Sequence, residues 1–214
     1  MLAWHFLAED KRLGYNDGRL VEVGQTLECE GEPVLCSNGM HGSARLIDAL
    51  RYASGPIVCR VEIDGDVIEG KYKLCGRRRT VLWMLDATRL LHEFACWCAE
   101  DALALVEQPD ARSVAAIEAK RRWLNGEITD EELAAARAAA RDAASAAAEA
   151  VARDDAWSAA EAASRAAAWD VAWSAARDAA RAAAGDDAWD AARDKQNKRL
   201  TEMVMAEHEK EGMT

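Results

Sequence analysis

Apolar residues change their spacing near residue 85 of the chain. Before this point, short apolar runs alternate with polar residues and are separated by glycine-containing turns, which is typical of β-strands. After it, apolar residues recur at intervals of three and four, the period of an α-helix. The pattern predicts an α+β fold. Residues 1–125 would form a small mixed β-sheet domain with covering helices, in which the sheet extends to about residue 85. An Ala-rich helical bundle or coil (129–210) would follow.

Turn signals subdivide the strand-rich part. The Asn-Asp-Gly of LGYNDGRL predicts a turn between two strands, and Asp64-Gly65 predicts the turn of a hairpin over 57–74. Alternation in this hairpin places one set of side chains outward (Val58, Arg60, Glu62) and the other inward (Cys59, Val61, Ile63).

The segment LCSNGMHGSARLIDALRYASG, residues 35–55, reads as a corner between a strand and a helix. Ser43 is a suitable N-cap for the helical pattern ARLIDALRYA, and Gly55-Pro56 would stop that helix. His41 then lies in the corner, where it would either bind a ligand or cap its own loop. The second reading is favoured, and Ser43 is read as a cap rather than a nucleophile because no acidic partner is evident.

The helical part carries clear end signals. Asn125-Gly126 is a C-terminal stop, and Thr129 with Glu132 forms a capping box that starts the next helix. The tail beyond is rich in alanine, whose small side chain favours helix but buries little area. The tail would form either several helices or one long rod. Its packing would rest on four tryptophans, and a homodimer through them is expected: Trp157, Trp169, Trp173 and Trp189.

The formal net charge is −11, which argues against direct nucleic-acid binding and suits docking on a basic protein surface. No apolar run is long enough to span a membrane, and the N-terminus does not resemble a signal peptide. The sequence therefore predicts a cytoplasmic protein. In that compartment the six cysteines are expected to be free thiols. Cys29, Cys36 and His41 offer only a partial zinc site, and no cofactor is predicted.

Three segments suggest a family: GRLVEVGQTL, EGEPVLCSNGMHGSARLIDALRYASGPIVCRVEIDGDVIEG and RRTVLW. Over about residues 4–105 they resemble a small domain of unknown function that is common in tailed-phage and prophage genomes. Relatives of this kind usually have alanine at Gly42, and often Asp-Lys in place of Tyr72-Lys73. The resemblance implies a phage accessory protein and implies no reaction.

A second analogy is with ADP-ribosyltransferase-like folds. His5 on the first strand, Ser43 in the corner and Tyr52 after the helix would correspond to the nucleotide-binding positions of such folds. The chemistry would also need a glutamate, and only Glu62 and Glu69 are available. This analogy rests on fold alone.

The run Arg77-Arg78-Arg79 is equally compatible with a solvated strand end and with a site for a phosphate or an acidic partner. No nucleophile–base pair, metal quartet or phosphate loop can be assembled, so the chain is not predicted to be an enzyme. The leading hypothesis is a stoichiometric inhibitor of a bacterial antiviral system, such as a CRISPR effector complex, acting in the host cytoplasm. A nucleotide-binding or ADP-ribosyltransferase-like N-terminal domain and a phage structural or assembly protein are the alternatives.

Overall fold

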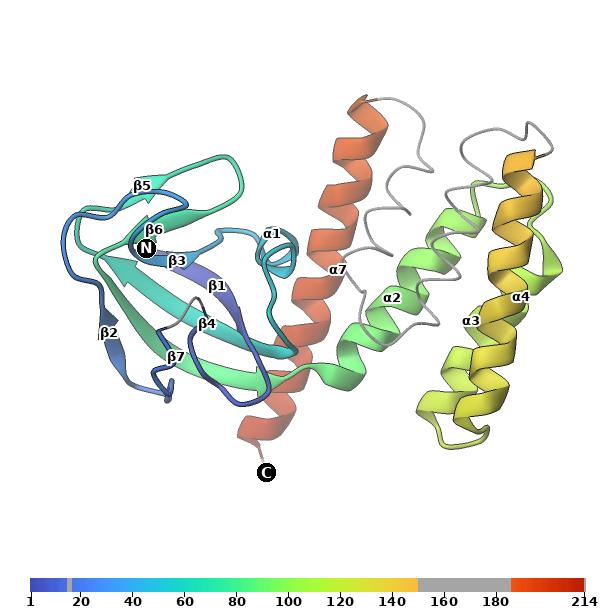
Figure 1. Ribbon diagram of the computed structural model, residues 1–214, viewed down its shortest axis with the longest axis horizontal. Coiled ribbons are helices and arrows are strands. Elements are labelled where there is room, and N and C mark those ends of the chain that lie inside the picture. The colour runs from blue at the N-terminus through green and yellow to red at the C-terminus, as the bar shows by residue number, and fades with distance from the viewer. Residues whose placement is uncertain (15–16, 150–185, 214) are drawn as a thin grey trace. The chain divides into compact units, whose positions relative to one another are not determined.

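The computed structural model describes residues 1–14, 17–149 and 186–213 (Figure 1). It contains sheets and helices in separate parts, which confirms the α+β class. The contacts divide the chain into two units: Met1–Thr88 with Leu200–Thr214 (unit 1) and Arg89–Arg199 (unit 2). The predicted domain boundary at 125–129 lies inside unit 2 and stays a prediction.

Unit 1 holds two antiparallel sheets. The larger has the strand order β1 (Leu2–Leu7), β4 (Ile57–Asp64), β7 (Arg78–Asp86), β2 (Thr26–Glu28). The smaller has the order β3 (Met40–Gly42), β6 (Leu74–Gly76), β5 (Ile68–Glu69). Figure 1 shows β4 and β7 as the two long strands of the larger sheet, flanked by β1 and β2.

One core fills the inner face of the larger sheet and includes side chains of the smaller one. Cys59, Val61 and Ile63 are fully buried in it, as the alternation predicts, together with Met40 of β3 and Leu74 of β6. Val58 is also fully buried, so its predicted outward, exposed position is wrong. Alternation alone does not reveal that both faces of a strand are covered.

The hairpin over 57–74 that was predicted from the turn at Asp64-Gly65 does not form. β4 pairs with β1 and β7, whereas β5 pairs with β6. The turn at Asp64-Gly65 exists, with Gly65 at a φ of +70°, but it leads the chain from the larger sheet into the smaller one. Local turn chemistry thus predicted the turn, and long-range pairing decided the partner strand.

The corner also differs from the prediction. His41 lies within β3, and the helix is a short one, α1 (Leu46–Leu50), whose N-cap is Arg45. Ser43 is not the cap because its backbone pairs with Trp4, through N–H···O bonds of 2.8 and 2.9 Å in the two directions. This pairing keeps the chain extended past the point where the side-chain pattern would begin a helix.

A β-bulge in β7 changes which side chains face the core. The register shifts between Arg60 and Val61 of β4, so that Val61 is opposite Val81 and Arg60 is opposite Trp83. The extra residue, Leu82, is 41% exposed. Before the bulge Arg79 and Val81 face the core, and beyond it Trp83 faces the opposite side of the sheet.

Unit 2 is helical and contains α2 (Thr88–Leu103), α3 (Ala111–Leu124), α4 (Asp130–Glu149) and the first half of α7 (Asp186–Gly212). The capping box is confirmed: Thr129 N–H donates to Glu132 Oε2 at 2.8 Å, and Glu132 N–H donates to Thr129 Oγ1 at 3.3 Å. The stop at Asn125-Gly126 is also confirmed, with Gly126 at a φ of +72°.

The tail tryptophans fall mostly outside the described residues. Trp157, Trp169 and Trp173 lie there, and Trp189 is partly buried on α7. Dimerisation through them stays a prediction. Among the helices that the structure describes, none combines the length and apolar character needed to span a bilayer.

Candidate functional site

The least expected side chain in unit 1 is Arg79, which is only 2% exposed. It stands opposite Ile63 of β4 and Leu27 of β2, two residues of the core. Its Nη1 donates to the backbone oxygen of His41 at 2.9 Å. Within the described part of the chain, neither Nε nor Nη2 has a hydrogen-bond partner. A guanidinium is therefore held in the core with two of its three nitrogens unsatisfied.

The two unsatisfied nitrogens are those that form a side-on fork. Nε–H and Nη2–H point in parallel from one edge of the guanidinium and match the two oxygens of a carboxylate or phosphate. In the same chain Arg19 uses this edge on Asp17, with Nε–Oδ1 at 2.6 Å and Nη2–Oδ2 at 2.7 Å. The same edge holds carboxylates in the pairs Arg112–Asp110 and Arg121–Glu100. On Arg79 this edge is buried and has no partner among the described residues.

Burial makes this unsatisfied edge costly. The pKa of Arg79 is lowered to about 10, chiefly by desolvation and also by the positive charge of Arg19. Asp17 and the Cys59 thiol oppose the shift, but Asp17 already holds Arg19. Since even this pKa lies well above 7, the guanidinium is charged at neutral pH, in a place where charge without a counter-ion is strongly unfavourable.

His5 and Cys59 complete the surroundings of this charge. His5 lies on the inner face of β1, between Ala3 and Leu7, and is opposite Cys59 of β4. Burial, then the charges of Arg79 and His41, hold the pKa of His5 well below 6.5. Burial also raises the pKa of the Cys59 thiol to about 12. At neutral pH both groups are uncharged, so Arg79 carries the positive charge of the site.

His41 links the site to the loop before β3. Its Nε2 accepts a 3.3 Å hydrogen bond from the N–H of Cys36, a residue with a φ of +69°. This confirms the prediction that His41 caps its own loop. Its pKa is lowered by burial first, then by the charges of Lys73 and Arg79. We call the group His5, His41, Cys59 and Arg79 the Arg79 cluster.

A break in the backbone pairing makes room for Arg79. β1 and β3 share a single bridge, at Trp4 and Ser43. If the antiparallel ladder continued, the next pair to exchange hydrogen bonds would be Phe6 and His41. The His41 oxygen instead accepts from Arg79, so the point where the two strands separate is where the guanidinium binds.

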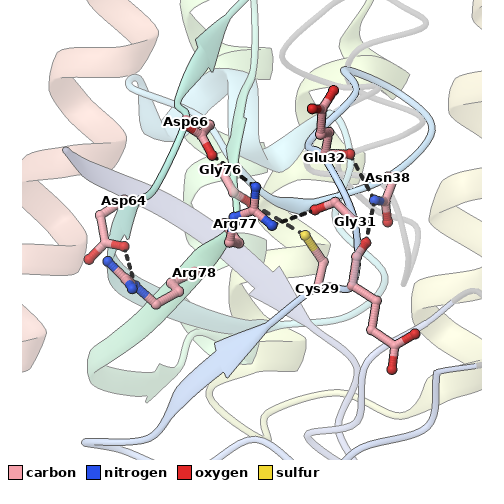
Figure 2. Close-up of polar contacts among 10 residues, drawn as sticks. Cys29, Gly31, Glu32, Asn38, Asp64, Asp66, Gly76, Arg77 and Arg78 are labelled. Atoms are coloured by element: carbon pink, nitrogen blue, oxygen red, sulfur yellow. Dashed lines mark hydrogen bonds and ion pairs between the residues drawn. The ribbon is translucent and has the colours of Figure 1, made fainter.

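The other two arginines of the basic run have different roles (Figure 2). Arg77 pairs with Asp66 at 2.9 Å and donates to the Gly31 oxygen at 2.9 Å. Arg78 pairs with Asp64 at 2.6 Å. Both are at least partly exposed and tie the turn after β4 to neighbouring segments. Strand alternation separates Arg78 from Arg79, and Arg77 lies before β7 begins. The shared face of Arg79 and Val81 was the available sequence signal.

Two other predicted groupings are not assembled. Tyr52 is exposed and contacts Arg51 and Lys73, and Ser43 is buried in its bridge with Trp4. Glu62 is exposed, on the face of β4 opposite to the one that carries Cys59, and Glu69 is exposed on β5 of the smaller sheet. The residues proposed by analogy with ADP-ribosyltransferases therefore do not form one site.

The partial zinc site is not formed either. The Cys29 Sγ lies 3.9 Å from the Gly76 oxygen, and Cys36 is exposed. Among the described residues, no group of three or more His, Cys, Asp or Glu side chains has an arrangement that could hold a metal ion.

Comparison with known proteins finds a match to one family model, over the first part of the chain. Residues 1–93 match the family model described as "Domain of unknown function (DUF7666)". This segment contains all four residues of the Arg79 cluster. No curated protein and no solved structure matches the chain.

Proposed function

We propose that unit 1 is an anion-binding module that holds a small carboxylate or phosphate ligand on the Nε–Nη2 edge of Arg79. The observation that carries this proposal is the buried guanidinium with two unsatisfied nitrogens in its fork. The role is binding rather than catalysis, because the neighbouring groups are a neutral imidazole and a protonated thiol at neutral pH.

The energetic argument is one of compensation. A buried donor without an acceptor costs about 1–3 kcal/mol, and more when it is charged. A ligand that supplies two oxygens to Nε and Nη2 removes this cost and neutralises the charge. Neutral His5 contributes an N–H donor at the same place, which suits an anion and disfavours a cation.

Thermal unfolding of the full-length protein tests the proposal, with inorganic phosphate or acetate as ligand and chloride at equal ionic strength as the reference. A bound anion should raise the melting temperature in a concentration-dependent way, because it binds the folded state. The gain should disappear in Arg79→Met and persist in Arg78→Met. The rise in melting temperature with phosphate, compared with that with acetate, shows which oxyanion is preferred. An equal gain in both variants, or no gain for either anion, would refute the proposal.

The hypothesis of a stoichiometric inhibitor of antiviral defence remains a separate proposal. The net charge of −11 supports it, since acidic proteins can occupy surfaces that normally hold nucleic acid. Affinity purification from a bacterial host, followed by mass spectrometry, tests it. Recovery of a defence complex supports the inhibitor, whereas recovery of capsid or tail proteins alone favours the structural alternative.

A further inference from the structure

A second site, independent of the Arg79 cluster, lies on the surface of unit 1. It is formed where α1 ends and where the chain turns between β5 and β6. We call it the tyrosine–cation patch, and it consists of Arg51, Tyr52, Lys71, Tyr72 and Lys73. The proposed function makes no use of these residues.

The patch is exposed yet built on ordered backbone. Tyr52 is 48% exposed and Tyr72 39% exposed. The N–H of Tyr52 donates to the Ala49 oxygen at 2.9 Å, which continues the turn of α1. The N–H of Gly70 donates to the Lys73 oxygen at 2.8 Å and closes the turn that carries Tyr72 at its centre. Both rings are thus displayed in fixed positions before any partner binds.

Two cations of the patch, Arg51 and Lys73, contact rings rather than acids. The Arg51 guanidinium lies 5.7 Å from the ring centroid of Tyr52 and 5.1 Å from that of Tyr72. The Lys73 ammonium lies 5.0 Å from the Tyr52 ring. Arg19, Arg77, Arg78, Arg112 and Arg121 each pair with a carboxylate. Among the described residues Arg51 and Lys73 pair with none, and a ring does not cancel their charge.

We infer that the tyrosine–cation patch binds a segment of single-stranded nucleic acid. Exposed aromatic rings that accept bases, with cations beside them for the phosphates, are the combination that such binding requires. An acidic peptide would need the cations but would have no use for two displayed rings. The overall acidic charge does not prevent this contact, because salt screens charges beyond about 8–10 Å. The inference differs from the expectation, drawn from net charge alone, of no direct nucleic-acid contact.

Fluorescence anisotropy of the full-length protein tests the inference, with a labelled oligothymidylate of about 12 nucleotides as probe. We expect binding at about 50 mM salt that weakens as salt rises, because the release of counter-ions from the phosphates favours binding less at higher salt. The double variant Tyr52→Leu/Tyr72→Leu should bind about tenfold more weakly or worse, since each stacked base contributes substantially. Tyr52→Phe/Tyr72→Phe keeps both rings and should retain most of the affinity.

A charge control separates the patch from general electrostatics. Arg51→Gln should weaken binding and flatten its salt dependence, whereas Arg122→Gln makes the same change of charge on an exposed residue of unit 2 and should do neither. Two results would overturn the inference: no binding of the oligonucleotide at low salt, or binding that the leucine double variant leaves unchanged. Equal competition by a polyglutamate peptide would assign the patch to an acidic protein segment instead.

Discussion

The indole of Trp83 on β7 and the imidazole of His208 on α7 stack with their ring centroids 4.1 Å apart and their planes inclined by 13°. The same indole meets the edge of Trp4 at 5.7 Å, and the Arg60 guanidinium lies 4.5 Å from the Trp4 ring centroid. The last helix therefore joins an aromatic array on the face of the larger sheet that points away from the Arg79 cluster. Leu200 and Val204 on the same helix are fully buried.

Leu200→Ala is expected to destabilise unit 1 by about 2–5 kcal/mol, the usual cost of removing a large buried aliphatic side chain. Chemical denaturation followed by near-ultraviolet circular dichroism would report this loss, because the tryptophans are in the affected region. Glu202→Ala, an exposed change on the same helix, should leave the transition within about 0.5 kcal/mol of the parent. Equal behaviour of the two variants would show that this end of α7 does not stabilise the sheet.

Anion binding by the Arg79 cluster should tighten as pH falls from about 7 toward 5. The pKa values of His5 and His41 are lowered in the ligand-free protein, and a bound anion would raise them. Binding therefore takes up protons and is favoured by acid. Isothermal titration calorimetry across this range measures the effect, and His5→Gln should reduce the pH dependence. Affinity that is constant with pH would place the anion away from both imidazoles.

His92 is expected to make the folded state acid-sensitive. Burial, then the charge of Lys120, lowers its pKa from 6.5 to about 4. The unfolded chain therefore binds a proton more readily, and stability is lost as pH falls from about 6.5 toward 4, by up to about 3 kcal/mol. Urea denaturation at several pH values should show this loss. In the variant His92→Gln, stability should fall less with decreasing pH than in the parent protein. An equal loss of stability in the parent and the variant would show that other groups cause it.

Lys120 is a buried cation whose replacement should increase stability. It is 1% exposed, its Nζ lies 3.9 Å from the Trp123 ring centroid, and burial lowers its pKa to about 8. Lys120→Met keeps the shape of the chain and removes the buried charge, so a gain of about 1–3 kcal/mol is expected at pH 7. The gain should shrink as pH rises from 8 to 10.5, because the parent lysine then loses its proton in the folded state while the unfolded chain still holds it, which removes the cost of the buried charge. The exposed change Lys198→Met is the control and should show neither effect.

Features that depend on neighbouring residues were predictable from the sequence. The capping box at Thr129 and the stop at Gly126 occur as predicted because each is completed within a few residues. Ser43 failed as a cap because its backbone pairs with Trp4, far away in the chain.

The Arg79 cluster shows the same limit at the candidate site. Arg79 was among the candidates, but its burial depends on the register of β7 with two other strands. Its side-chain hydrogen bond to the His41 oxygen joins positions 38 residues apart. Cys59 was expected in the core but not beside a charge. Alternation predicts which face a residue occupies, whereas the identity of its neighbours across sheets requires the three-dimensional pairing.

Because unit 1 combines Met1–Thr88 with Leu200–Thr214, its assembly during translation cannot finish in sequence order. Roughly 110 residues of unit 2 are synthesised between the two parts, which at about 5–20 residues per second takes about 5 to 20 s. During that interval Trp83 and its neighbours would be exposed on a nascent chain. The first-made strands of unit 1 therefore wait for residues 200–214 before they acquire their final cover.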